Sequence, residues 1–182
     1  MTDQPRRRNI EIKARCADLS AARECCRALG ATALSVERQR DTYFAAVRGR
    51  LKLREIEGRD AALIGYERPD QAAARASDYQ IVSVPEPERL IEVLGAALGV
   101  RVVVNKQREV FLYRNVRIHL DTVEELGTFL EFEAVMGPGQ SDAEGRDVIE
   151  ELRKRFGIQD GDLVAVSYAD LLSHLSGTSY SV

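Results

Sequence analysis

The sequence of 182 residues lacks several features that mark large classes of protein. It has no run of about 18 apolar residues, which a membrane-spanning helix would need. Its net charge of −3 gives no overall attraction to nucleic acid or to an acidic membrane surface. No Pro/Gly-rich linker and no repeat of solenoid length divides the chain. We therefore expect one domain over residues 1–182, with a core from about residue 9 to residue 175.

Cysteine is scarce, and its positions do not suggest a crosslinked framework. The three cysteines are Cys16, Cys25 and Cys26, an odd number with two of them adjacent. The two histidines of the chain are far from them in sequence, so a Cys/His metal site lacks suitably spaced partners. Residues 1–8 are polar and lack the apolar stretch of a signal peptide. We therefore expect a reduced cytoplasmic protein that binds neither nucleic acid nor a membrane.

Hydrophobic periodicity predicts a mostly antiparallel β-protein with several helices. The expected strands cover residues 9–15, 34–46, 50–56, 61–68, 78–84, 101–113, 115–123 and 128–136. Helices are expected from Asp18 or Ser20 to about Leu29, over 86–98, from Ser141 to about Phe156, and over 162–175. The Ala-rich stretch 69–77 is expected to be a loop. Strands with this alternation usually close into a barrel or a sandwich, so the expected fold class is α+β.

Charged residues alternate with apolar ones in these strands, so each strand has one charged face. Side chains at positions i and i+2 point to the same side of a strand. The charged faces carry Glu11, Lys13 and Arg15; Arg50, Lys52 and Arg54; Lys106 and Arg108; Arg117, His119 and Asp121; and Glu131 and Glu133. For a single strand, the common explanation is a sheet with its charged side in water and its apolar side on a core.

The charges are also sorted by sign, which a solvated face does not require. Neighbours on one face carry like charges in three strands: Lys52 with Arg54, Lys106 with Arg108, and Glu131 with Glu133. Like charges side by side destabilise a sheet unless an opposite charge lies between them. A polyphosphate with divalent metal ions supplies such charges, because Arg and Lys bind phosphate oxygens and hard cations bind carboxylates. The pattern therefore predicts a site for a polyanion and a metal ion.

The ordered set of charged segments resembles the CYTH family, which comprises class IV adenylate cyclases and thiamine-triphosphatase-like enzymes. The segments that carry the resemblance lie at 9–13 (NIEIK), 41–44 (DTYF), 51–54 (LKLR), 106–108 (KQR), 117–121 (RIHLD) and 131–133 (EFE). Each motif alone is weak, but their order is specific and spans residues 9 to about 172. The resemblance implies an eight-stranded antiparallel tunnel with helices packed outside, a small-molecule triphosphate or polyphosphate, and Mg²⁺ or Mn²⁺.

The resemblance also implies roles for individual residues. The metal-binding acids are expected to be Glu11, Asp121, Glu131 and Glu133. The triphosphate contacts are expected to be Lys13, Lys52, Arg54, Arg68, Lys106, Arg108 and Arg117. Among these, Lys13, Arg54 and Arg108 are expected to act directly in catalysis, and Lys106 is a weaker match.

Two positions depart from the family pattern. The signature Glu-x-Glu-x-Lys begins here with Asn9, whose amide offers a metal one oxygen without charge, so one metal ion is a safer expectation than two. Tyr66 occupies or neighbours a position where many members carry a lysine, and Arg68 can compensate for the missing charge.

Three functions are compatible with these residues. The leading hypothesis is a metal-dependent phosphohydrolase of the triphosphatase type. A class IV adenylate cyclase, which makes cyclic AMP from ATP, would need the same cradle, but no clear adenine-reading motif is present. A polyphosphate-binding module without turnover is the third, because of the changes at Asn9 and Tyr66. His119 could assist proton transfer, although a neutral hydrogen-bonded histidine is more common. The apolar stripe of the helix over 86–98 fits either the core or a homodimer surface.

Overall fold

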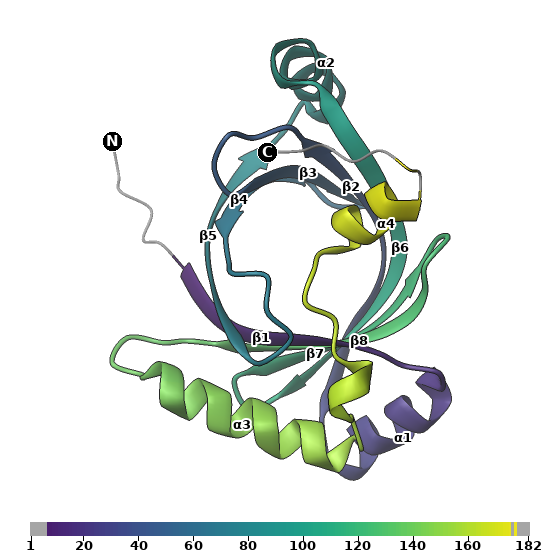
Figure 1. Cartoon of the computed structure of the whole chain (residues 1–182), viewed down its shortest axis with the longest axis vertical. Helices are drawn as coiled ribbons and strands as arrows, with labels where there is room; N and C mark the ends of the chain where they lie inside the picture. Colours follow the sequence, from purple (N-terminus) through teal and green to yellow (C-terminus); the bar gives the residue numbers. More distant parts are fainter. Residues whose placement is uncertain (1–6, 176, 178–182) are drawn as a thin grey trace.

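A computed structural model describes residues 7–175 and residue 177 (Figure 1). The expectation that residues 1–8 form no signal peptide concerns mainly residues 1–6, which lie outside the described residues. The elements are β1 (Arg7–Arg15), α1 (Leu19–Ala28), β2 (Thr32–Phe44), β3 (Arg50–Ile56), β4 (Ala61–Glu67), β5 (Arg75–Val84), α2 (Pro87–Leu98), β6 (Val100–Tyr113), β7 (Val116–Val123), β8 (Gly127–Val135), α3 (Asp142–Arg155), the 3₁₀ helix η1 (Asp160–Asp162) and α4 (Tyr168–Leu175). No helix in this described part is long and apolar enough to cross a membrane.

The eight strands form a closed barrel, which Figure 1 shows end-on as a ring. The order around the ring is β1-β5-β4-β3-β2-β6-β7-β8, and β8 pairs with β1 to close it. All neighbouring strands are antiparallel. The predicted α+β fold with an eight-stranded antiparallel barrel is therefore confirmed. Closure gives every strand one face toward the interior and one toward the outside.

Apolar side chains of the strands face outward, where helices cover them. α1 and α3 pack against β1, β7 and β8, below the ring in Figure 1. Ile10, Ile118 and Phe132 are fully buried in this contact. Burial of each such side chain stabilises the fold by roughly 1.5–3 kcal/mol. Because a shift by one residue would expose all of them, this packing determines which side chains point into the barrel.

α2 covers another part of the outer wall, at the top of Figure 1. Leu90, Ile91 and Leu94 pack against buried side chains of β2, β3, β4 and β5. Leu98 stays 40% exposed. The apolar stripe of this helix was expected to belong either to the core or to a homodimer surface, and most of it packs against the core.

α4 closes one end of the barrel instead of packing against the outer wall. Tyr168 of this helix meets Phe129 of β8 edge-on, with ring centroids 4.9 Å apart. Asp170 anchors the helix to the wall through Arg101 at 2.7 Å and Arg50 at 3.1 Å. The expectation that all helices lie outside therefore needs this one qualification.

The last helix is shorter than the predicted span 162–175. The chain is extended just before α4, where the amide of Val164 donates to a backbone carbonyl of β1 at 2.8 Å. The helix then starts with a reciprocal cap. The amide of Ser167 donates to Asp170 Oδ2 at 3.0 Å, and the amide of Asp170 donates to Ser167 Oγ at 3.2 Å. The helix therefore begins at Tyr168 and not at residue 162, because the preceding segment pairs with β1 and the cap lies at Ser167.

The predicted loop 69–77 is also too long, because β5 begins at Arg75. Residues 75–77 pair with β1, with Arg75 opposite Glu11 and Ser77 opposite Asn9. The Ala-rich composition of this stretch gives no alternation. Pairing with a strand distant in sequence therefore determines its structure.

Candidate functional site

The barrel encloses a polar cavity of about 270 Å³, and every strand contributes to its wall. The predicted site residues that line this cavity are Glu11, Lys13, Lys52, Arg54, Arg68, Lys106, Arg108, Arg117, Glu131 and Glu133. Asp121 shares the inward face of β7 with Arg117 and His119 but is fully buried, and it contacts the cavity residue Arg108. The inward faces predicted from the alternation thus meet in one place.

Three of the predicted bases surround Asp41, a buried residue that sequence reasoning did not assign to the site. Lys52 Nζ donates to Asp41 Oδ2 at 2.8 Å, and Arg54 donates to both carboxylate oxygens at 2.7 Å. Lys106 Nζ lies 3.8 Å from Asp41 Oδ2. Burial would raise the pKa of Asp41, but these cations hold it well below its usual range. With one carboxylate among three cations, this side of the cavity keeps an excess of positive charge.

Two buried lysines of the cavity have low pKa values. Burial, with the nearby charge of Arg108, lowers the pKa of Lys106 to about 7, although Asp121 opposes the change. Burial also lowers the pKa of Lys13 to about 8, although Glu131 lies 3.2 Å from its Nζ and favours the charged form. A bound anion would raise both pKa values, because it stabilises the ammonium form. The cavity can therefore take up protons when it binds an anion.

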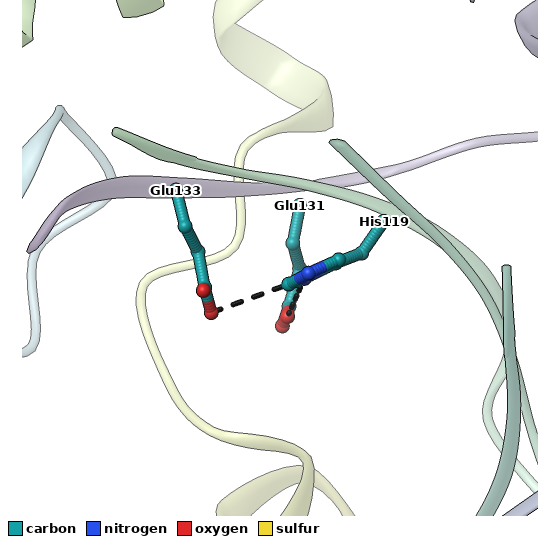
Figure 2. A group of neighbouring side chains, drawn as sticks. All are labelled: His119, Glu131 and Glu133. Carbon is teal, nitrogen blue, oxygen red and sulfur yellow. Dashed lines mark ion pairs between the residues drawn. The ribbon is translucent and has the colours of Figure 1, made fainter. Parts of the chain in front are cut away.

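The opposite side of the cavity carries an acidic group formed by Glu131, Glu133 and His119 (Figure 2). His119 Nδ1 lies 3.8 Å from Glu131 Oε2 and 3.9 Å from Glu133 Oε1. Burial lowers the pKa of His119, and Arg108 acts in the same direction, so the imidazole is neutral at pH 7. Burial would raise the pKa of Glu133, but His119 and Arg117 outweigh it and lower the pKa to about 2.

Basic side chains hold the two carboxylates in place. Arg117 Nη2 lies 2.8 Å from Glu133 Oε2, and Arg108 Nη2 lies 2.5 Å from Glu131 Oε2. Lys13 contacts the second oxygen of Glu131. These contacts fix the orientation of both carboxylates and keep them ionised. They leave Glu133 Oε1 directed at His119.

Two of the acids predicted to bind metal are engaged elsewhere. Asp121 accepts from Arg108 Nε at 2.7 Å and from Tyr168 Oη at 2.9 Å, so it positions Arg108 from behind. Glu11 lies 3.1 Å from Arg68 Nη1 and 3.5 Å from the Nε of Arg75. All four predicted acids thus contact arginines, and Glu131 and Glu133 differ from the other two because they also face His119.

Sequence reasoning also missed Tyr168, which lines the cavity, and Arg75, which contacts the cavity residue Glu11. Arg75 is completely buried and donates from Nη1 to the backbone carbonyls of Gln71 and Val164. The Tyr168 ring lies beneath the ammonium group of Lys13, with 3.7 Å from Nζ to the ring centroid. No signal pointed to either residue, because Arg75 fell in a predicted loop and Tyr168 in a helix without alternation.

Asn9 and Tyr66, the two departures from the family pattern, both line the cavity. With the amide oriented to satisfy its neighbours, Asn9 accepts from Arg117 Nη2 at 3.0 Å and donates to the backbone carbonyl of Arg8 at 3.1 Å. The side-chain oxygen of Asn9 is therefore engaged by the guanidinium group of Arg117. The ring centroid of Tyr66 lies 5.8 Å from Lys52 Nζ. Arg68 lines the same cavity and lies 3.1 Å from Glu11, and its compensating role stays a prediction.

A larger hollow of about 790 Å³ adjoins the interior cavity, and Gln39, Ile56 and Lys106 line both. Its charges pair with each other across β2 and β3. Arg38 lies 3.8 Å from Glu57, and Arg40 lies 3.7 Å from Glu55. Exposed pairs of this kind contribute about 0–1 kcal/mol and leave little unbalanced charge. The interior cavity, with its unbalanced cations and its acidic group, is the candidate site.

Comparison with known proteins agrees with this geometry. Residues 7–168 match the CYTH domain family. The PH1012 protein of Pyrococcus horikoshii OT3 has 27% identity and a TM-score of 0.80, with 90% of this chain and 98% of that chain covered. An adenylate cyclase candidate from Vibrio parahaemolyticus has 20% identity and a TM-score of 0.74, with 91% and 97% covered.

HpAC1 from Hippeastrum, a protein described as having a dominant triphosphatase activity, has 17% identity and a TM-score of 0.61, with 94% of this chain and 97% of that chain covered. At such identities these two likenesses concern the fold. No curated protein sequence matches the chain significantly. The match to the family over most of the sequence, together with the closed barrel and its charged interior, establishes that the chain belongs to the CYTH domain family.

Proposed function

We propose that this protein is a metal-dependent enzyme that binds a triphosphate inside the barrel and transfers its terminal phosphoryl group to water. The observation that carries the proposal is the division of one cavity into two sides. Buried bases gather on one side around Asp41, and the pair Glu131 and Glu133 lies on the other. At about 270 Å³ the cavity is close to the lower end of the range of about 300–1,000 Å³ typical of ligand sites, which suits a small polar substrate.

The bases would hold the phosphate oxygens. Arg54 and Arg108 present planar guanidinium groups that can bind two phosphate oxygens each, and carboxylates already fix their orientation. Lys13, Lys52 and Lys106 add point charges. Because all of these groups are ordered before substrate arrives, they stabilise the charge that develops in phosphoryl transfer without reorganisation.

The acidic group fits a divalent metal ion. Glu131 and Glu133 offer carboxylate oxygens, which Mg²⁺ and Mn²⁺ prefer, and a buried imidazole nitrogen faces both. When bound, such an ion lowers the pKa of a coordinated water and neutralises phosphate charge. Arg117 and Lys13 hold the two carboxylates in position, so the chain itself keeps this site preformed.

Lys13 is placed between the two sides of the cavity. Its Nζ lies 3.2 Å from Glu131 and directly over the ring of Tyr168. With a pKa of about 8 it is mostly protonated at neutral pH. It can therefore donate hydrogen bonds to the phosphoryl group nearest the acids. Lys13, Arg54 and Arg108 are the residues that we assign to catalysis.

Cyclisation of ATP is the second candidate reaction, since the same cradle would serve it. It is supported by the Vibrio parahaemolyticus neighbour, whereas the Hippeastrum neighbour supports hydrolysis. The two reactions release different products. Hydrolysis of the terminal bond yields orthophosphate, and cyclisation yields pyrophosphate with cyclic AMP.

A product assay tests the proposal. The protein would be incubated with Mg²⁺ or Mn²⁺ and with ATP, thiamine triphosphate or tripolyphosphate, and orthophosphate, pyrophosphate and cyclic AMP would be resolved. We expect orthophosphate, its loss in Arg54→Ala, and unchanged release in Arg38→Ala, which removes an exposed arginine of the outer wall. Cyclic AMP as the main product would favour the cyclase. If none of the substrates gave a product, the enzymatic proposal would be refuted and a polyphosphate-binding module would remain.

A further inference from the structure

His119 has an unusual environment for a buried histidine. It is 4% exposed, and its Nδ1 atom has no hydrogen-bond partner among the described residues. The nearest acceptors are Glu131 Oε2 and Glu133 Oε1, at 3.8 and 3.9 Å, which is too long for a hydrogen bond. A buried polar atom without a partner costs about 1–3 kcal/mol, so the site is incomplete as it stands. Figure 2 shows the imidazole directed at both carboxylates.

The distances leave room for one ion among the three side chains. Metal–nitrogen and metal–oxygen bonds of about 2.0–2.2 Å place two ligand atoms up to about 4.4 Å apart. The two distances from His119 Nδ1 fall within this limit, and one ligand atom from each of the three residues lies within 4.8 Å of the others. Arg108 Nη2 lies 2.5 Å from Glu131 Oε2, so the ion would share this oxygen with Arg108.

Neighbouring residues support this arrangement. Arg117 binds Glu133 Oε2 and leaves Oε1 facing the imidazole. His119 lies directly opposite Glu131 across β7 and β8, and Arg117 lies opposite Glu133. All three candidate ligands are thus fixed on two paired strands, which gives the precision that a metal site requires.

We propose that His119 is a nitrogen ligand of the metal ion held by Glu131 and Glu133, and that it makes this site prefer Mn²⁺ to Mg²⁺. The inference rests on the metal site of the proposed function but is independent of the reaction catalysed. Mg²⁺ takes oxygen ligands and gives up its water reluctantly, whereas imidazole nitrogen binds the transition-metal ions better. Binding through Nδ1 requires the tautomer that carries its proton on Nε2.

Isotope labelling of the full-length protein tests the ligand directly. Mn²⁺ would be added to unlabelled protein and to protein with ¹⁵N-labelled histidine, and electron spin echo envelope modulation would be recorded. We expect ¹⁴N modulation from a coordinated nitrogen, replaced by a ¹⁵N signal on labelling. The chain contains two histidines, so His119→Gln should abolish the signal and His174→Gln should retain it. His174 is exposed on α4 and serves as the matched control.

The metal preference needs a second readout. Calorimetric titration of Mn²⁺ and Mg²⁺ without any triphosphate would give both affinities for the wild type and for His119→Gln. Loss of an outer contact to a metal ligand typically costs 10–100-fold in affinity, so we expect at least about tenfold weaker Mn²⁺ binding in the variant. Mg²⁺ binding should change much less. An equal loss for both ions would overturn the preference.

Other results would overturn the assignment itself. Mn²⁺ bound without a histidine nitrogen signal in the wild type excludes His119 as a ligand, even if Mn²⁺-dependent hydrolysis is found and the proposed function stands. Failure of Mn²⁺ to bind the wild type, or binding unaffected by the double replacement of Glu131 and Glu133 with Gln, excludes the site. If His119→Gln does not fold, labelled wild type and labelled His174→Gln still decide, because a signal that His174→Gln retains can only come from His119.

Discussion

Asp41→Asn probes the basic side of the cavity most sharply. The Asp41 carboxylate contacts Lys52 and Arg54 directly, and Lys106 lies 3.8 Å away. The substitution keeps the shape of the side chain but leaves three cations without their counterion. Removing one partner of a buried ion pair typically costs about 3–5 kcal/mol. In a domain of this size 1 kcal/mol corresponds to roughly 2–4 °C, so we expect the Tm to fall by about 6–20 °C.

Tripolyphosphate should restore part of this loss, because its negative charge would take the place of the missing carboxylate. Thermal unfolding would be followed for both proteins with and without saturating tripolyphosphate. We expect the difference in Tm between wild type and variant to shrink when the ligand is present. The control is Asp60→Asn at an exposed position, which should change stability by less than about 0.5 kcal/mol. An equal deficit with and without tripolyphosphate would refute the reasoning, since the anion would then bind elsewhere.

The same residue gives a pH dependence with a defined sign. The pKa of Asp41 in the folded protein lies well below its ordinary value of 3.8. Its contribution to stability is therefore fully present at neutral pH and is lost as the pH falls below about 4 toward the folded-state pKa. Asp41→Asn lacks this contribution at every pH. The stabilities of the two proteins should converge in acid, and a difference that stays constant down to pH 2 would contradict the assignment.

Three further predictions concern Lys106, Tyr168 and Gly145. The affinity for tripolyphosphate should fall as the pH rises above 7, because Lys106, with a pKa of about 7, loses the charge that holds the anion. Calorimetry would measure the affinity as a function of pH, and the affinity of Lys106→Met should depend less on pH. Tyr168→Phe removes the hydrogen bond to the Asp121 carboxylate, which should lower the free energy of unfolding by about 1.5–3 kcal/mol in urea denaturation. Gly145→Ala should cost about 1–3 kcal/mol, because the new Cβ would lie 2.6 Å from a side chain of β1. Gly161→Ala meets nothing within 4 Å, and an equal cost there would contradict the packing argument.

The alternation of charged and apolar residues predicted strands with one charged and one apolar face and left a barrel and a sandwich open, and the resemblance to the CYTH family added the eight-stranded tunnel. In the closed barrel the outward apolar faces must be buried under helices, and the charged faces are then forced inward. Lys13, Arg54 and Glu133 lie in the cavity for this reason. Such residues could be assigned from their own strand alone.

The partners of these residues could not be predicted, because they depend on register between strands. Arg108 lies opposite Asp121 across β6 and β7, and His119 lies opposite Glu131 across β7 and β8. The first pairing occupies Asp121, and the second creates the acidic group. The sequence of a single strand determines neither pairing register. Arg75 was missed for a related reason, since pairing with β1 and not its own sequence places it in a strand.

A crystal structure of the protein with Mn²⁺ and tripolyphosphate, recorded at a wavelength where manganese scatters anomalously, tests the central proposal most directly. We expect an anomalous peak between Glu131 and Glu133, with phosphate oxygens in contact with Arg54 and Arg108. Manganese bound away from these carboxylates, or tripolyphosphate bound outside the barrel, would contradict the proposed site.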